Sequence, residues 1–129
     1  MGTGFKGGAS HHHTISENIS DVKSEYPYSG GYFGKVGKSG NTHVRNIESD
    51  DPVADSKNFY DKIARGGVES PIKDKNGNVK GHLSKMADGS IVSWREVSNS
   101  DGSPAVDINI ERSSDSGGIK QQKIHFVLK

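Results

Sequence analysis

Residues 50–67 read DDPVADSKNFYDKIARGG and decide the fold. Aspartate followed by proline is typical of a helix start, because the carboxylate accepts hydrogen bonds from free backbone N–H groups and proline suits the first turn. The two glycines at the end of the stretch are typical of a helix stop. A stripe with helical spacing is formed by Ser56, Phe59, Tyr60 and Ile63. The stretch therefore predicts a helix over residues 52–65.

Beyond this helix the spacing of apolar residues changes from helical to alternating, which is typical of strands. Asn76-Gly77 and Asp88-Gly89 suit tight hairpin turns, because glycine adopts positive φ without strain. The expected strands are Ile72–Lys75, Asn78–Met86, Ser90–Ser98, Ala105–Arg112 and Lys120–Leu128, with a polar connection over residues 99–104. We therefore expect an α+β fold in which an N-terminal helix packs on a twisted antiparallel sheet of four to five strands.

Residues 1–50 are rich in glycine, serine and asparagine and have no sustained apolar period. We interpret them as a linker, and residues 51–129 as the folded domain. The adjacent histidines at 11–13 are interpreted as part of the linker, since no carboxylate or cysteine accompanies them to close a metal site. An aromatic patch is expected to cross the domain surface as an extended arm, and it comprises Tyr26, Tyr28, Tyr32, Phe33 and Val36.

The composition limits the possible classes of protein. A chain of 129 residues with 29% hydrophobic residues has room for one small core. The absence of cysteine excludes disulfides and thiolate metal sites, and no apolar run approaches the roughly 18 residues that a membrane span needs. With a net charge of +1, any surface that binds nucleic acid must be local. No phosphate-binding loop, paired-carboxylate motif or HExxH motif is present, which disfavours nucleotide-triphosphate chemistry.

Side chains alternate between the two faces of a sheet, so the apolar residues of each strand predict its buried face. The residues expected to point inward on three strands are Val92, Trp94, Val106, Ile108, Ile110, Ile124, Phe126 and Leu128. Their outward neighbours are Ser93, Arg95, Asp107, Asn109, Lys123 and His125. Taking Val79 and Leu83 as inward on the preceding strand adds Lys80, His82 and Ser84 to the outward set.

This outward face would combine imidazole, guanidinium, ammonium and hydroxyl groups, which suit RNA cleavage without a metal or other cofactor. RNA carries its own nucleophile, the 2′-hydroxyl, so catalysis needs proton transfer by histidine and stabilisation of the phosphate charge by cations. We expect the two histidines to transfer protons, the two cations to hold the phosphate, and the serine or aspartate to orient a partner. The expected catalytic residues are His125, Arg95, His82, Lys123, Ser93 and Asp107. An ion pair between Asp107 and Arg95 is the structural alternative for these two residues.

Residues 85–110, KMADGSIVSWREVSNSDGSPAVDINI, together with Gln122–Phe126, resemble the C-terminal effector module of bacterial polymorphic toxins. The likeness is to modules on secreted LXG-type proteins of Gram-positive bacteria and to the contact-dependent inhibition class, and it covers residues 51–129. The order of helix and strands also resembles the barnase, EndoU, colicin and RelE group of ribonucleases. The chain lacks the closely spaced histidine motif of EndoU, so no catalytic position is transferred from that group.

The resemblance implies a ribonuclease toxin that is secreted as part of a larger protein and delivered to the cytoplasm of a competing cell. It also implies a cognate immunity protein as partner, with RNA as substrate and tRNA as one candidate. No membrane partner is expected for the isolated domain. Two alternatives are a metal-dependent DNase toxin, for which Asp107 and Glu111 are the available carboxylates, and a noncatalytic interaction domain.

Overall fold

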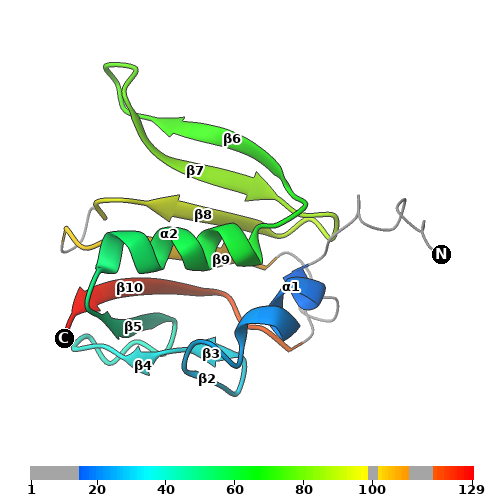
Figure 1. Cartoon of the computed structure of the whole chain (residues 1–129), viewed down its shortest axis with the longest axis vertical. Helices are drawn as coiled ribbons and strands as arrows, with labels where there is room; N and C mark the ends of the chain where they lie inside the picture. The colour runs from blue at the N-terminus through cyan, green and yellow to red at the C-terminus, as the bar shows by residue number, and fades with distance from the viewer. Residues whose placement is uncertain (1–14, 99–101, 111–117) are drawn as a thin grey trace.

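The computed structural model describes residues 15–98, 102–110 and 118–129 (Figure 1). These residues form an α+β fold with two helices and a mostly antiparallel sheet. The elements in chain order are α1 (Ile15–Val22), β2 (Tyr28–Ser29), β3 (Tyr32–Phe33), β4 (Lys35–Val36), β5 (Val44–Ser49), α2 (Pro52–Ile63), β6 (Val68–Lys73), β7 (Val79–Lys85), β8 (Ile91–Arg95), β9 (Ala105–Asn109) and β10 (Gln122–Leu128).

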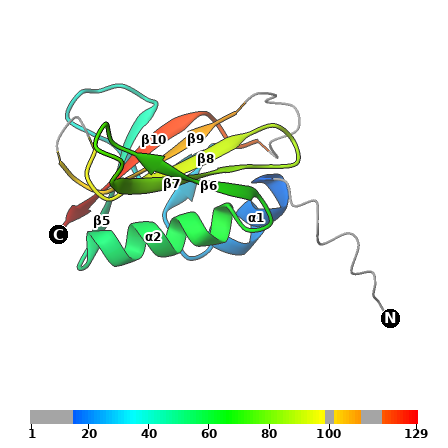
Figure 2. The ribbon, with the colours of Figure 1, turned by 90° about the horizontal axis from the view of Figure 1, so that it is seen from above.

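The main sheet has seven strands in the order β4-β5-β10-β9-β8-β7-β6, and β2 and β3 pair separately. Every neighbouring pair in the main sheet is antiparallel except β5 and β10, which run parallel. The C-terminal strand β10 therefore lies inside the sheet, between β5 and β9. Both helices lie against one face of the sheet (Figure 2). We call the opposite face the outer face.

Helix α2 confirms the helix predicted over residues 52–65 to within two residues at its end. Asp51 caps its N-terminus by accepting a hydrogen bond from the backbone N–H of Ala54 at 3.3 Å. Gly66 follows the helix with a φ of 82°, a conformation that residues with a Cβ rarely adopt. The predicted stripe is buried against the sheet, and it comprises Ser56, Phe59, Tyr60 and Ile63.

Five strands follow α2 in the predicted order, with shifted ends. The first strand was expected at residues 72–75. The structure has β6 there, which ends at Lys73 because a turn begins at Asp74. The Asp74 carboxylate accepts hydrogen bonds from the backbone N–H groups of Asn76 and Asn78 at 2.8 and 3.0 Å. Gly77 completes this turn with a φ of 84°. Parts of the predicted connection and of the fourth predicted strand lie outside the described residues, at positions 99–101, 111 and 112.

Residues 15–50 belong to the fold, which corrects the prediction of a linker with an arm for this segment. Helix α1 packs on α2, where the Asn18 side chain donates to the backbone oxygens of Ile63 and Arg65 at 2.8 and 2.9 Å. Strand β5 extends the sheet beside β10. Because α1 has only eight residues and β5 buries a single apolar side chain, Ile47, neither gives a sustained apolar period. Residues 1–14 lie outside the described residues.

The expected aromatic arm enters the core instead of crossing the surface. Phe33 is fully buried, and its ring centroid lies 4.8 Å from that of Phe59 on α2. The Phe59 ring also contacts Phe126 of β10 at 5.6 Å and Tyr26 at 5.0 Å. These rings join the N-terminal segment, α2 and the C-terminal strand in one core, so the N-terminal segment contributes to the stability of the whole fold.

Replacing Ile47 by alanine should lower the free energy of unfolding by about 2–5 kcal/mol, because Ile47 is buried in the core at 5% exposure. Val36→Ala is the control, since Val36 on β4 is 44% exposed and should change stability by less than about 1 kcal/mol. Urea unfolding followed by circular dichroism measures both. Equal, small effects of the two substitutions would contradict a structural role for β5.

Candidate active site

Two rows of side chains cross the outer face, and the strand register defines them. Residues directly opposite each other on neighbouring strands share a face. The His125 row comprises Asn46 on β5, His125 on β10, Ala105 on β9 and Arg95 on β8. The Lys123 row lies beside it along the strands and comprises Lys123 on β10, Asp107 on β9 and Ser93 on β8. Five of the six expected catalytic residues therefore lie on this face.

The predicted phase of β8, β9 and β10 is confirmed by burial. The inward side chains are at most 8% exposed, and they are Val92, Trp94, Val106, Ile108, Ile124 and Phe126. Ile110 is only partly buried. Leu128 was expected in the core but is 71% exposed, because β10 pairs with β9 only as far as His125 and its last residues have β5 as their one neighbour.

The predicted phase of β7 is wrong, and it moves His82 to the α2 side of the sheet. His82 is opposite Trp94, and Ser84 is opposite Val92, so both side chains lie on the face that α2 covers. The His82 ring stacks on the Trp94 ring with centroids 6.1 Å apart. Val79 does not predict which side chains of β7 point inward, because a register irregularity in the β6–β7 pairing lies between Val79 and His82. His82 is thus not brought together with His125.

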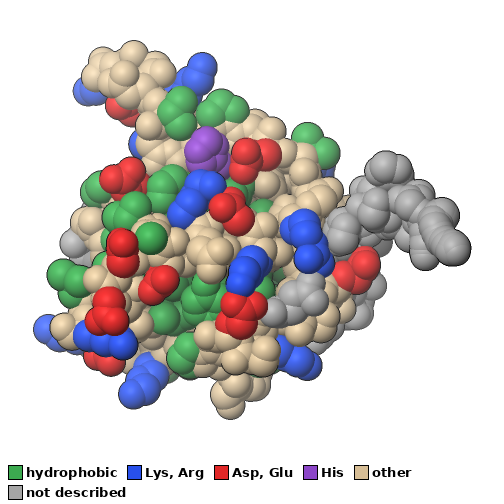
Figure 3. All heavy atoms as spheres, in the orientation of Figure 1, with side chains coloured by type: hydrophobic (Ala, Val, Ile, Leu, Met, Phe, Trp, Pro, Cys, Tyr) green, Lys and Arg blue, Asp and Glu red, His purple; other side chains and the backbone are tan. Residues whose placement is uncertain are grey.

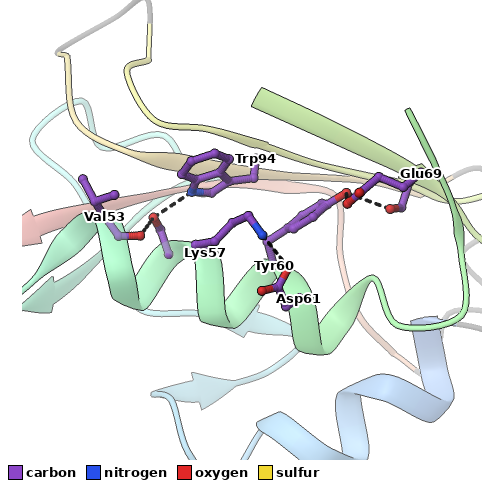
Figure 4. A network of polar contacts seen from close by, with 8 residues as sticks. Val53, Lys57, Tyr60, Asp61, Glu69 and Trp94 are labelled. Carbon is purple, nitrogen blue, oxygen red and sulfur yellow. Dashed lines mark hydrogen bonds and ion pairs between the residues drawn. The ribbon is translucent and has the colours of Figure 1, made fainter. Parts of the chain in front are cut away.

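The polar groups between α2 and the sheet satisfy one another (Figure 4). Trp94 Nε1 donates to the Ser56 hydroxyl at 2.8 Å. The Tyr60 hydroxyl donates to Glu69 at 2.9 Å and lies 2.7 Å from the Ser84 hydroxyl. Burial raises the pKa of Tyr60 well above its usual range, so this hydroxyl stays protonated. We interpret this network as structural, because each of its groups already has a partner.

Basic side chains on the α2 side are also paired. Figure 3 shows acidic and basic side chains intermixed over this side of the molecule. Lys57 forms an ion pair with Asp61 at 2.8 Å, and Lys62 forms one with Glu25. Exposed pairs of this kind contribute little to stability, but neither of these two lysines is left without an acidic partner. The outer face differs in this respect.

The Arg95 side chain forms no hydrogen bond or ion pair with any described residue, and its Nε atom is buried. The alternative ion pair with Asp107 is absent, because Asp107 is opposite Ser93 rather than Arg95. Buried donors in proteins are nearly always paired, and leaving one unpaired costs about 1–3 kcal/mol. An anion bound beside Arg95 would give this group its acceptor.

His125 is 4% exposed and its Nδ1 atom lies 2.9 Å from the Ser103 hydroxyl. Its side chain nevertheless lines a pocket of about 650 Å³. The other side chains that line this pocket come from β5, from the end of β10 and from the loop between β4 and β5, and they include Lys38, Asn46 and Val127. The imidazole is therefore shielded from bulk water but faces a cavity that a ligand can enter.

A second pocket, of about 400 Å³, lies over the Lys123 row. Ser93, Asp107 and Lys123 line it, and each of these side chains is partly buried. None of the three side chains forms a hydrogen bond or ion pair with another described residue. Partly buried polar groups that leave one another unpaired are available to bind a ligand. His43 and Asn109 also line this pocket.

Sequence reasoning missed three residues at these two pockets, namely Lys38, His43 and Asn46. All three lie in the segment interpreted as linker. The only local signal was the strand β5 itself, whose alternation is too short to identify from sequence. The position of Asn46 on the outer face follows from the parallel pairing of β5 with β10, a contact between distant parts of the chain.

Among the described residues, no group of three or more histidine, aspartate or glutamate side chains could hold a metal ion. In the same part of the chain, no helix is long and apolar enough to span a membrane. The chain matches no protein-family model, no curated protein and no solved structure.

Replacing Arg95 by methionine should leave the free energy of unfolding unchanged or raise it by up to about 1 kcal/mol, because the substitution removes an unpaired buried donor. The matched control is Arg45→Met. Arg45 donates to the backbone oxygens of Gly34 and Phe33 at 2.8 and 3.2 Å, so its loss should cost about 1–3 kcal/mol. Thermal and urea unfolding measure both variants. If both lose the same stability, Arg95 has a structural role.

Proposed function

We propose that the outer face is the active site of an endoribonuclease that acts without a metal ion. The observation that carries this proposal is the His125 row, in which only the methyl group of Ala105 separates His125 from Arg95. Strands in a sheet lie about 4.8 Å apart, so the backbones of these two residues are roughly 10 Å apart. Both side chains are long enough to reach one phosphate group placed above Ala105.

The chemistry follows from the groups in and beside this row. The 2′-hydroxyl of RNA attacks the adjacent phosphorus, so the protein must move protons and stabilise the negative charge on the phosphate oxygens. His125 can move a proton near neutral pH, because imidazole titrates there. Arg95 can bind two phosphate oxygens with its planar guanidinium, and Lys123 adds a second positive charge from the neighbouring row.

Ser93 and Asp107 complete the Lys123 row beside this centre. The ionised carboxylate of Asp107 can only accept hydrogen bonds, whereas the Ser93 hydroxyl can donate or accept. In the proposed complex these two groups orient the ribose of the substrate or the cationic group of Lys123. His82 has no role in this centre, because it lies on the other side of the sheet.

Within the ribonucleases, the chain is best explained as a toxin domain of the bacterial polymorphic class. Support comes from the resemblance of residues 85–110 and 122–126 to such effector modules. These segments include β8, β9 and most of β10, which are neighbours in the sheet and carry the five catalytic residues proposed above. The toxin would be secreted within a larger protein, act in the cytoplasm of a competing cell on RNA such as tRNA, and be blocked by a cognate immunity protein.

A noncatalytic domain that binds nucleic acid is the second candidate. The low exposure of His125, 4%, and its contact with Ser103 favour a structural histidine. A binding domain would still use Arg95 and Lys123 to contact phosphates, but it would leave the RNA intact. The DNase alternative has Asp107 on the outer face, while its second carboxylate, Glu111, lies outside the described residues.

The purified chain should cleave tRNA and total RNA in the presence of EDTA and leave 2′,3′-cyclic phosphate ends. His125→Ala should lower kcat/KM by about 10²–10⁴-fold, since it removes a proton-transfer group. Arg95→Met should lower it by about 10²–10³-fold, since it removes charge stabilisation. Gel electrophoresis of end-labelled RNA measures the rates, and mass spectrometry identifies the ends.

Three controls separate the alternatives to this proposal. His82→Ala should retain cleavage, because this imidazole stacks on Trp94 on the α2 side. An RNA with a single 2′-deoxy nucleotide at the cleavage position should resist cleavage there. Cleavage of DNA that requires magnesium would instead support the DNase, and RNA that is bound but intact would support the binding domain.

Expression of the whole chain in a bacterial cytoplasm should stop growth, and His125→Ala should restore it. The physical reason is that loss of cellular RNA blocks translation, whereas a binding domain at the same level leaves RNA intact. Residues 15–50 must be included in the expressed chain, because they supply β5 and part of the core. Colony counts and total RNA gels after induction measure the outcome. Unchanged growth with intact RNA argues against a toxin.

A further inference from the structure

His43 lies at the pocket over the Lys123 row, which His82 does not reach. It directly precedes β5, and its backbone oxygen accepts a hydrogen bond from the backbone N–H of Lys123 at 2.8 Å. His43 lines the 400 Å³ pocket together with Ser93, Asp107 and Lys123. Unlike His125, the His43 side chain is exposed.

The surroundings of His43 determine which ring nitrogen titrates. Nδ1 lies 2.8 Å from the backbone oxygen of Gln121. A carbonyl oxygen can only accept, so Nδ1 carries a hydrogen in both the neutral and the charged ring. Nε2 is therefore the atom that gains and loses a proton, and in the neutral ring it is a free acceptor. This is the state that a proton-accepting catalyst needs.

The aromatic ring of Tyr32 restricts the orientation of this imidazole. The two ring centroids are 5.8 Å apart, and the Tyr32 hydroxyl lies 3.4 Å from Nδ1. The Tyr32 ring also contacts Arg45, whose guanidinium lies 4.9 Å from the ring centroid. The charged and titratable groups around His43 are thus Tyr32 and Arg45 from β3 and β5, Lys123 from β10 and Asp107 from β9.

His43 and His125 line two adjoining pockets. Val44 lines both pockets, so the cavity that contains His43 adjoins the one that contains His125. Lys123 and His125 are two residues apart on β10, which corresponds to roughly 7 Å along a strand, and their side chains share the outer face. His43 and His125 therefore line adjoining pockets, with Lys123 in the first of them.

We propose that His43 is the base and His125 the acid of the cleavage reaction. His43 Nε2 takes the proton of the 2′-hydroxyl as its oxygen forms a bond to phosphorus. The bond from phosphorus to the 5′-oxygen breaks, and protonated His125 gives its proton to that oxygen. The products are a 2′,3′-cyclic phosphate and a 5′-hydroxyl, with no other reactant consumed. This inference rests on the ribonuclease function proposed above.

Two substrates distinguish the base from the acid. An RNA dinucleotide has a poor leaving group that needs a proton, whereas a uridine 3′-(p-nitrophenyl phosphate) has a good leaving group that does not. On the dinucleotide, both His43→Asn and His125→Ala should lower kcat/KM by about 10²–10⁴-fold. On the activated ester, His125→Ala should recover most of the wild-type rate and His43→Asn should not.

His43→Asn is the preferred variant because the asparagine amide can donate to the Gln121 oxygen in place of Nδ1 but cannot accept a proton at neutral pH. Thermal unfolding should show that it folds like the wild type, and His82→Ala serves as the imidazole control. The pH profile gives a second readout. A base acts only in its neutral form, so the limb on which wild-type kcat/KM rises with pH should be absent in His43→Asn.

A ¹⁵N NMR titration of the wild-type chain tests the tautomer without any substitution. In the neutral ring it should show the hydrogen on Nδ1 of His43 and none on Nε2. The opposite tautomer would overturn the inference, as would a His43→Asn variant with wild-type rates and both limbs of the pH profile. Recovery of His43→Asn, but not of His125→Ala, on the activated ester would overturn the assignment of base and acid. A wild-type chain that cleaves no RNA would overturn the ribonuclease proposal itself.

Discussion

The insertion of β10 between β5 and β9 is the constraint on which the rest of the structure depends. Ile124 and Phe126 point inward and fill the core beneath α2, while Lys123 and His125 point outward at the centre of the outer face. Hydrogen bonds on both edges hold the register of this strand. A slip by one residue would exchange the apolar and the polar set, so the core and the candidate site are specified together.

Polar side chains of the described residues have partners on the α2 side of the sheet and lack them at several positions on the outer face. On the α2 side, the hydroxyl of Tyr60, the indole of Trp94 and the ammonium group of Lys57 all have partners within the fold. On the outer face, the buried Nε of Arg95 has none, and the side chains of the Lys123 row leave one another unpaired. Unpaired groups of this kind are unfavourable for stability in the free protein, and an anion would give Arg95 and Lys123 the acceptors that they lack among the described residues.

The long-range position of β5 connects this site to the N-terminal segment. Its parallel pairing with β10 places Asn46 beside His125 and positions the loop that carries His43 at the pocket wall. The same segment contributes Phe33 to the core. Stability and the proposed chemistry therefore both depend on residues 15–50. Because this segment has no regular apolar pattern, its composition did not indicate that it belongs to the fold.

Where apolar residues alternate without interruption, the sequence predicted the structure well. Helix α2 and the faces of β8, β9 and β10 followed from local spacing, because helix and strand periodicity are properties of consecutive residues. The phase of β7 did not follow, because a register irregularity separates Val79 from the residues that face α2. That irregularity depends on the pairing with β6 and leaves no local pattern.

Local spacing alone predicted helix α2, the order of the strands after it and the inward face of β8, β9 and β10. It therefore also predicted that Arg95, Lys123 and His125 share the opposite face. The positions of the other two histidines depend on long-range pairing. Pairing with Trp94 places His82 on the α2 side, and the pairing of β5 with β10 brings His43 to the pocket over the Lys123 row. The physical reason is that alternation within a strand is local, whereas the neighbours of a strand are chosen by burial of the whole chain.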